Sequence, residues 1–451
     1  MNIVPAVHGQ KYCPRSNSMR QLRSSVSVRA RCKNAPNGSG GTGRVRSYAT
    51  TGASAEAPRG PRPPTSIKRA EAEVARLAAT PLYPLALADL VRYGRPPLDA
   101  SALLSSANFT LSLLPHRLAH RIQSLRNLPF IVVSNPHISK IYHNYLHSLS
   151  TLLPYTERPV SSMAEESTFT EVMADLVQTH ANTIPTLARG FLECRKYIDP
   201  AEVTRFLDEH LRARIGTRLI AEQHIALHVS SQPQASGDGA PSASSSSYIG
   251  VIDTSLRPAT VIHNCGSFVS EICELKYGVR PSLVIDGQPD TTFAYVPVHL
   301  EYIITELLKN AFRASVETGM EREPVAITIA AAPEEGPPAT GEEASSIPGV
   351  TVRIRDRGGG ISPEHLPNIW SYSFTTFSDE DLPAGVVDGS VDALNAISAS
   401  GGGSSSIAGL GYGLPLSRAY AEYFNGGIAV QSMWGWGTDV YLSLRGVGKL
   451  E

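Results

Sequence analysis

HLEYIITELLKNAFRAS, residues 299–315, has the spacing of one amphipathic helix. At about 100° per residue, one face collects only apolar side chains, those of Leu300, Ile303, Ile304, Leu307, Leu308 and Ala311. The opposite face carries a polar stripe formed by Tyr302, Glu306, Lys309, Asn310 and Arg313. Because such a stripe most often faces solvent, the motifs that follow it decide whether it belongs to a catalytic site.

Two glycine motifs follow this helix. RIRDRGGGI alternates as a strand does, ends at Asp356 and runs into residues 358–360, where three glycines allow a sharp turn. A carboxylate at that point can accept a hydrogen bond from an exocyclic amine such as that of adenine. In GLGYGLPLSRAYAEYF, residues 409–424, alternate glycines precede a helix whose free amide groups can surround phosphates.

The glycine loop alone matches none of the common nucleotide-binding motifs. The third glycine of a dinucleotide loop would be Leu414, and no Gly-Lys-Ser/Thr follows as in a Walker A loop. The His-Arg-Asp and Asp-Phe-Gly signatures of eukaryotic-type protein kinases are absent from the sequence. The specific signal is the order of four motifs: E-x-x-x-N on a helix, D-x-G-x-G after a strand, G-x-G-x-G opening a helix, and GTD entering a last strand.

The chain divides by composition. A long helical pattern predicts a helix bundle over residues 68–229, and a Ser-rich stretch at 230–247 predicts a disordered insertion. Short segments such as PVAITIAA and GVTVRIRD then predict an α+β domain with a largely antiparallel sheet over 248–446, followed by a tail at 447–451. Two low-complexity stretches inside this domain, residues 332–348 and 379–408, are expected to be flexible insertions.

The N-terminal segment is basic and free of acidic residues up to Glu56. It predicts a mitochondrial transit peptide over 1–48, cut after Tyr48 in RVRSYAT, with a disordered linker at 49–67. A nucleic-acid-binding arm or a disordered tail is the alternative. Removing the nine basic residues would lower the formal net charge of −1 by nine, and so acidic a mature chain argues against DNA as the main partner.

The composition of the whole chain and its cysteine spacing argue against a membrane-spanning protein, a zinc-binding protein and a disulfide-rich protein. A hydrophobic fraction of 42% with 18% charged residues is that of a soluble globular protein, and no run of about 18 apolar residues predicts a membrane span. Beyond the N-terminal segment the cysteines are Cys194, Cys265 and Cys273, whose spacing matches no zinc motif and implies no disulfide framework. We expect His263, Cys265 and Cys273 to be structural residues of one helix.

The ordered motifs resemble the GHKL (Bergerat-fold) ATPase superfamily of histidine kinases, gyrase, Hsp90 and MutL. Within it, ELLKNAFRAS, DRGGGI, SFTTF and GLGYGLPLSRAYAEYFNGG resemble the mitochondrial kinases of pyruvate dehydrogenase and branched-chain 2-oxo-acid dehydrogenase. The resemblance covers roughly residues 80–446 apart from the insertions. It implies a multidomain α and α+β protein, in which a helix bundle of the four-helix type precedes a Bergerat α/β-sandwich domain that binds ATP.

The same resemblance implies a protein-serine kinase that uses Mg-ATP to phosphorylate and inactivate the α subunit of a 2-oxo-acid dehydrogenase. By matching motif, Glu306 would be the general base, Asn310 the Mg²⁺ ligand, and Asp356 the acceptor of the adenine amine. Lys309 and Arg313 would face phosphate or neighbouring carboxylates. The remaining nucleotide-binding residues would be Gly358, Gly360, Thr375, Thr376, Gly409, Leu410, Gly411, Tyr412, Gly413, Leu414 and Thr438.

Substrate choice stays open between pyruvate and branched-chain dehydrogenase. Pyruvate dehydrogenase kinases usually have His four residues before the base, where this chain has Tyr302, and the chain ends without their Asp-Trp tail. Both features favour the branched-chain type. The resemblance also implies an anion site for a 2-oxo-acid at His180, Arg214 and Arg218, for which an ordinary pair of surface arginines is the alternative.

The resemblance further implies a homodimer, docked in the mitochondrial matrix on a lipoyl domain of the acyltransferase core. Two other functions stay open. A histidine kinase would phosphorylate its own His, although His116 and His120 lie outside the usual acceptor context. An ATP-gated clamp, or a module that only binds ATP, would use the same nucleotide site without protein-kinase activity.

Overall fold

A computed structural model describes residues 67–232, 247–332, 349–372 and 411–447. Within these residues no helix combines the length and apolar character needed to cross a membrane. The segment expected to be the transit peptide, the linker up to residue 66, and all or most of each of the three expected insertions lie outside the described residues. The first described helix begins at Ile67.

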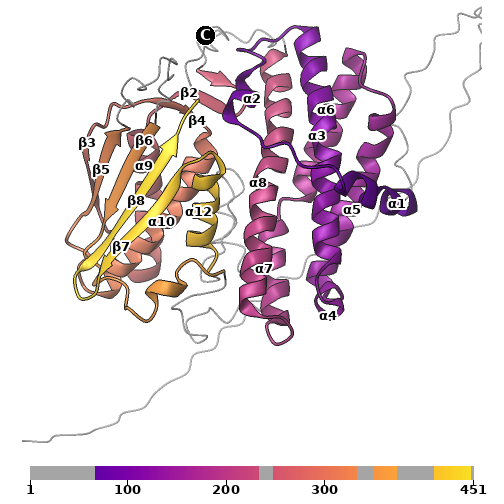
Figure 1. The fold of residues 1–451 in the computed structure, drawn as a ribbon. Helices are drawn as coiled ribbons and strands as arrows, with labels where there is room; N and C mark the ends of the chain where they lie inside the picture. The colour runs from indigo at the N-terminus through magenta and orange to yellow at the C-terminus, as the bar shows by residue number, and fades with distance from the viewer. Residues whose placement is uncertain (1–66, 233–246, 333–348, 373–410, 448–451) are drawn as a thin grey trace, which may run out of the picture. The chain divides into compact units, whose positions relative to one another are not determined.

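The N-terminal half is a bundle of helices (Figure 1). Its central helix, α3, packs against α5, α6 and α8, and α5 also packs against α7. Side-chain caps start the long helices: Asp99, Asn135, Ser162 and Asp199 each accept hydrogen bonds from free backbone amides of the first turn. The bounds are α1 Ile67–Ala78, α2 Leu87–Val91, α3 Ala100–Arg126, α4 Phe130–Val133, α5 Pro136–Glu157, α6 Met163–Thr179, α7 Thr183–Cys194 and α8 Pro200–Ser231.

The C-terminal half is an α/β domain with a five-stranded sheet in the order β3-β5-β6-β8-β7. Only β3 and β5 pair in parallel, so the prediction of a largely antiparallel sheet is confirmed. Helix α10 packs against α9, α12 and strand β6, which makes it the middle of the helical layer. The bounds are α9 Pro258–Tyr277, β3 Leu283–Gly287, α10 Pro297–Glu317, β5 Val325–Ala331, β6 Gly349–Arg355, η2 Leu366–Asn368, α12 Gly413–Tyr423, β7 Gly427–Met433 and β8 Gly437–Arg445.

Alternation of side chains places the core between this sheet and its helices. Val325, Ile327 and Ile329 of β5 are buried, and so are Val350, Val352 and Ile354 of β6. On the opposite face, Arg355 donates hydrogen bonds of 2.6 and 2.7 Å to Asp439 of β8. All six apolar residues of the α10 face are buried as well, which confirms the amphipathic helix expected over 299–315.

Two features of the fold were not predicted. A second, three-stranded sheet in the order β1-β2-β4 joins Tyr248–Ile249, Ile252–Leu256 and Phe293–Tyr295. Helix α8 continues to Ser231, two residues into the segment expected to be disordered.

Cys265 and Cys273 lie buried on α9, and burial raises the pKa of the Cys265 thiol to about 11, so both side chains act as apolar packing residues.

Candidate active site

Glu306 lies at the contact between α10 and the start of α12. Its carboxylate accepts a 2.8 Å hydrogen bond from Lys309 Nζ, and its side chain is only 15% exposed. The other carboxylate oxygen faces Gly413, the first residue of α12, where a Cβ would overlap Oε2. A side chain at residue 413 would therefore displace the Glu306 carboxylate from this position. The Glu306 carboxylate thus lies between the Lys309 ammonium group and the N-terminus of α12.

Asn310 follows one turn later and is exposed. No hydrogen bond involves its carboxamide among the described residues. An unpaired amide oxygen fits a hard cation such as Mg²⁺, which usually takes one or two protein ligands and completes its shell with phosphate and water. Arg313, on the same stripe, donates a 2.6 Å hydrogen bond to Glu317. Lys309 and Arg313 thus both contact neighbouring carboxylates.

Asp356 and Thr438 are brought together from strands β6 and β8. The Asp356 amide donates to the Thr438 carbonyl at 3.0 Å, and Asp356 Oδ1 accepts from the amides of Gly358 at 2.8 Å and Thr438 at 3.3 Å. Burial raises the pKa of the Asp356 carboxyl, and the two amides oppose that effect. Since both amides use Oδ1, the second oxygen remains to accept an exocyclic amine.

The loop after Asp356 passes closely over α10. At Gly358 a Cβ would lie 2.7 Å from the backbone carbon of Ala314, too close for any side chain. Ala314 follows Asn310 by one helical turn. The structure therefore brings the loop after Asp356 against one part of α10 and Gly413 against another, so that segments predicted to hold the two ends of ATP both contact this helix.

The structure describes only part of the glycine loop that is predicted to bind phosphates, beginning at Gly411. Gly411 has a φ of +72°, and the buried ring of Tyr412 lies 5.3 Å from that of Tyr372. Gly413 and Leu414 begin α12, as the sequence predicts. Thr375, Thr376, Gly409 and Leu410 lie outside the described residues.

Sequence reasoning missed an aromatic cluster beside Glu306. Tyr302 was placed on the polar stripe, yet its ring packs 5.1 Å from that of Tyr420 on α12, and burial raises the pKa of its hydroxyl well above the usual value. The His299 ring lies 4.7 Å from Tyr420 on the same side. The spacing of His299 and Tyr302 on α10, three residues apart, was the available signal that these side chains share a partner helix.

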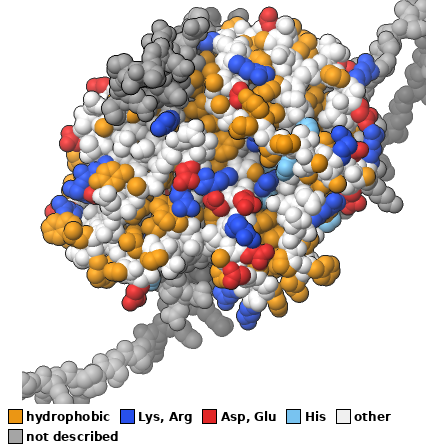
Figure 2. All heavy atoms as spheres, in the orientation of Figure 1, with side chains coloured by type: hydrophobic (Ala, Val, Ile, Leu, Met, Phe, Trp, Pro, Cys, Tyr) orange, Lys and Arg blue, Asp and Glu red, His pale blue; other side chains and the backbone are white. Residues whose placement is uncertain are grey.

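A band of paired charges joins the bundle to the α/β domain where α8 meets α12 (Figure 2). Arg212 of α8 pairs with Asp208 at 2.8 Å and with Glu422 of α12. In addition, Tyr423 of α12 packs against Gly216 of α8, where a Cβ would overlap its hydroxyl. These contacts hold α12 against α8.

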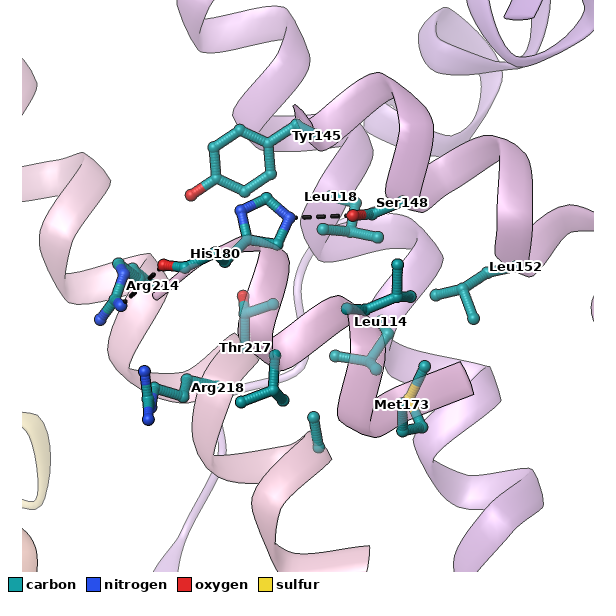
Figure 3. A pocket seen from close by; sticks show the side chains of 13 residues that line it. Leu114, Leu118, Tyr145, Ser148, Leu152, Met173, His180, Arg214, Thr217 and Arg218 are labelled. Carbon is teal, nitrogen blue, oxygen red and sulfur yellow. Dashed lines mark hydrogen bonds between the residues drawn. The ribbon is translucent and has the colours of Figure 1, made fainter. Parts of the chain in front are cut away.

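A cavity of about 50 Å³ lies within the bundle and is lined by the three residues of the predicted anion site, His180, Arg214 and Arg218. His180 Nε2 and the Ser148 hydroxyl lie 2.9 Å apart, and Arg214 donates a 3.1 Å hydrogen bond to the His180 carbonyl. Figure 3 shows Arg214 and Arg218 at one end of the lining, with Leu152 and Met173 at the other. The volume suffices for a few waters or a small organic anion.

The charge of this cavity is positive and poorly compensated. Arg218 pairs with Glu222 at 2.7 Å, whereas Arg214 is 7% exposed and has no carboxylate partner within the described ranges. Burial, assisted by Arg214, lowers the pKa of His180 to about 4, so its ring is neutral near pH 7. The two arginines are therefore not an ordinary surface pair, because one of them is a buried cation facing an apolar cavity.

Comparison with known proteins gives two family matches. Residues 84–253 match the model described as mitochondrial branched-chain alpha-ketoacid dehydrogenase kinase, and residues 295–447 match that of the histidine kinase-, DNA gyrase B- and HSP90-like ATPases. A mitochondrial pyruvate dehydrogenase (acetyl-transferring) kinase of Arabidopsis thaliana is 32% identical over 80% of this chain and 89% of its own length.

Two further relatives are of the same kind. The mitochondrial pyruvate dehydrogenase (acetyl-transferring) kinase 1 of Saccharomyces cerevisiae is 32% identical over 82% of this chain and 86% of its own length. The mitochondrial isozyme 4 of the human kinase is 30% identical over 81% of this chain and 84% of its own length. Similarity therefore extends through both the bundle and the α/β domain.

Proposed function

Since the chain belongs to the family of mitochondrial kinases that act on 2-oxo-acid dehydrogenases, we propose that it transfers the γ-phosphoryl group of Mg-ATP to a serine of such a dehydrogenase α subunit, and so inactivates the complex. The observation that supports this most is that α10, which carries Glu306 and Asn310, is contacted both by the loop after Asp356, at Gly358, and by the first residue of α12, Gly413. In this proposal Glu306 is the base, Asn310 the metal ligand and Asp356 the adenine acceptor.

In the proposed reaction the serine oxygen attacks the γ-phosphorus, its proton passes to the Glu306 carboxylate, and ADP leaves. Lys309 holds Glu306 in place before the serine arrives. Asn310 would hold Mg²⁺, which neutralises charge on the phosphates when bound. Asp356 and Thr438 orient the adenine, and the amides at the start of α12 receive phosphate oxygens. Positioning and charge neutralisation carry most of the catalysis, as in other phosphoryl transfers.

The deciding experiment offers purified residues 49–451 both pyruvate and branched-chain 2-oxo-acid dehydrogenase with labelled Mg-ATP. We expect acid-stable label on serine of one α subunit and a parallel loss of dehydrogenase activity. The preferred complex then settles the substrate, for which Tyr302 favours the branched-chain enzyme and the names of the relatives favour pyruvate dehydrogenase. Absence of label from both α subunits would refute the proposal.

The same experiment separates the alternatives. Acid-labile label on the chain itself would indicate a histidine kinase, although His116 and His120 lie outside the usual acceptor context. ATP hydrolysis without any labelled protein would indicate an ATP-gated clamp.

We also propose that the bundle cavity binds a 2-oxo-acid, with its carboxylate at Arg214 and Arg218 and its aliphatic tail at the apolar end. A ligand at about 100 times its Kd should stabilise the fold by about 2.7 kcal/mol and raise Tm. We expect 4-methyl-2-oxopentanoate to raise Tm in the wild type and in Arg212→Met, which lies outside the cavity lining, but not in Arg214→Met. An equal shift in all three proteins would contradict this site, and differential scanning fluorimetry measures it.

The remaining assignments follow from the family. We propose a matrix location reached through residues 1–48, a homodimer, and docking on the lipoyl domain of the acyltransferase core. The molar mass of the protein, measured by light scattering with and without a lipoylated domain, tests the homodimer and the docking.

A further inference from the structure

Ser432 and Thr438 lie directly opposite each other on the β7–β8 hairpin (Figure 1). Thr438 alternates along β8 with Leu442 and Leu444, which are buried beneath the helical layer, so it lies on the same face of the sheet. Opposed residues of antiparallel strands direct their side chains to one face, so Ser432 shares it. The two hydroxyl oxygens are 3.1 Å apart. Ser432 therefore meets Thr438 on the side of the sheet that carries the proposed ATP site.

Ser432 is also bound to the glycine-rich loop that follows Asp356. Its hydroxyl oxygen accepts a 2.7 Å hydrogen bond from the amide of Ile361, the residue after the three glycines. The backbone of Thr438 is held separately, because its amide donates to Asp356 Oδ1 at 3.3 Å and its carbonyl accepts from the Asp356 amide at 3.0 Å. These bonds fix the backbone of Thr438 and leave only the direction of its hydroxyl hydrogen to be decided.

The contacts of Ser432 decide that direction. Since its oxygen accepts from the Ile361 amide, its own hydrogen points to an acceptor, and Thr438 Oγ1 at 3.1 Å is nearer than the Gly437 carbonyl at 3.5 Å. Thr438 then accepts from Ser432 and keeps its own hydrogen for another acceptor. Among the residues that the structure describes, the Thr438 hydroxyl makes no second hydrogen bond.

We infer that Ser432 is a positioning residue that makes the Thr438 hydroxyl a hydrogen-bond donor toward the nucleotide base. Asp356, to which Thr438 is bonded, is the proposed acceptor of the adenine amine, so the donor serves the ring nitrogen next to that amine. This nitrogen has a lone pair in adenine and carries a hydrogen in guanine, so the donor favours ATP. The inference rests on the ATP site of the proposed function, but not on phosphotransfer.

Calorimetry on Ser432→Ala, Thr438→Val and the double variant tests this role with two ligands, Mg-ATP and Mg-1-deaza-ATP. The analogue keeps the amine but has C–H in place of the adjacent ring nitrogen. We expect each single variant to weaken ATP binding about fivefold, the net effect of one hydrogen bond, and the double variant to weaken it no further. The wild type should bind the analogue about fivefold more weakly than ATP, and Ser432→Ala should change that Kd by less than about twofold.

Ser443→Ala is the matched control. Ser443 forms a similar cross-strand pair on the same sheet, with its hydroxyl oxygen 3.4 Å from that of Thr351, but this pair is exposed and lies on the opposite face. The variant should leave both Kd values unchanged. Circular dichroism and Tm establish that every variant is folded.

Three outcomes would overturn the role of Ser432 while the kinase assignment stands: an unchanged Kd of ATP in Ser432→Ala, equal weakening of ATP and the analogue, or effects of Ser432→Ala and Thr438→Val that multiply. In the last two cases Ser432 would only support the hairpin turn. The expected cycle together with an absence of label on either dehydrogenase would instead refute the proposed phosphotransfer and leave the role of Ser432 in place.

Discussion

Glu306→Gln is expected to lower kcat for phosphotransfer by about 10²–10⁴-fold, the usual contribution of a general base. The carboxamide has nearly the same size, so it keeps the contact with Gly413 but cannot take the serine proton. Steady-state phosphorylation of the dehydrogenase α subunit gives kcat, and calorimetry gives the Kd of Mg-ATP. That Kd should change by only about twofold, since a base acts on the transition state.

Two further variants on α10 are compared with Glu306→Gln, one as a control and one that should also affect nucleotide binding. Glu317→Gln alters a carboxylate of α10 that is paired with Arg313 and lies about three turns beyond Glu306, so kcat should stay within about twofold. Asn310→Ala removes the proposed metal ligand, so it should weaken Mg-ATP binding together with kcat. Full phosphotransfer by Glu306→Gln would show that another group accepts the proton.

Periodicity and motif order were enough to predict the frame of the site. The apolar face of α10 is buried as a 3.6-residue repeat requires, and the alternating segments form β5 and β6. Asp356 lies directly after strand β6 and before the glycines, as predicted, and its role as the adenine acceptor stays a prediction. The structure added the reason for one of these glycines, since Gly358 has to pass over Ala314.

Contacts between elements could not be predicted in the same way. Tyr302 falls on the polar side of α10 by angle, yet the side that a helix buries depends on its neighbours, and here α12 covers that side. Arg214 and Arg218 share a spacing typical of surface pairs, but only packing shows that Arg214 is a buried cation. The three-stranded sheet was not predicted because its strands are two, five and three residues long, too short for a periodic pattern.

Asp356→Ala is expected to weaken ATP binding by roughly 100-fold, the upper range for one hydrogen bond to a charged group. It removes the acceptor for the adenine amine and also leaves the amides of Gly358 and Thr438 without Oδ1. Asp356→Asn should lose less ATP affinity, because its amide oxygen can still accept from those two amides.

Asp439→Asn, at the ion pairs with Arg353 and Arg355 on the other face of the sheet, is the control and should bind ATP normally. Calorimetry with ATP and with GTP, whose base offers a carbonyl where adenine has its amine, completes the design. Loss of ATP binding without any change in the preference for ATP over GTP would show that Asp356 supports the fold of the loop rather than reading the base.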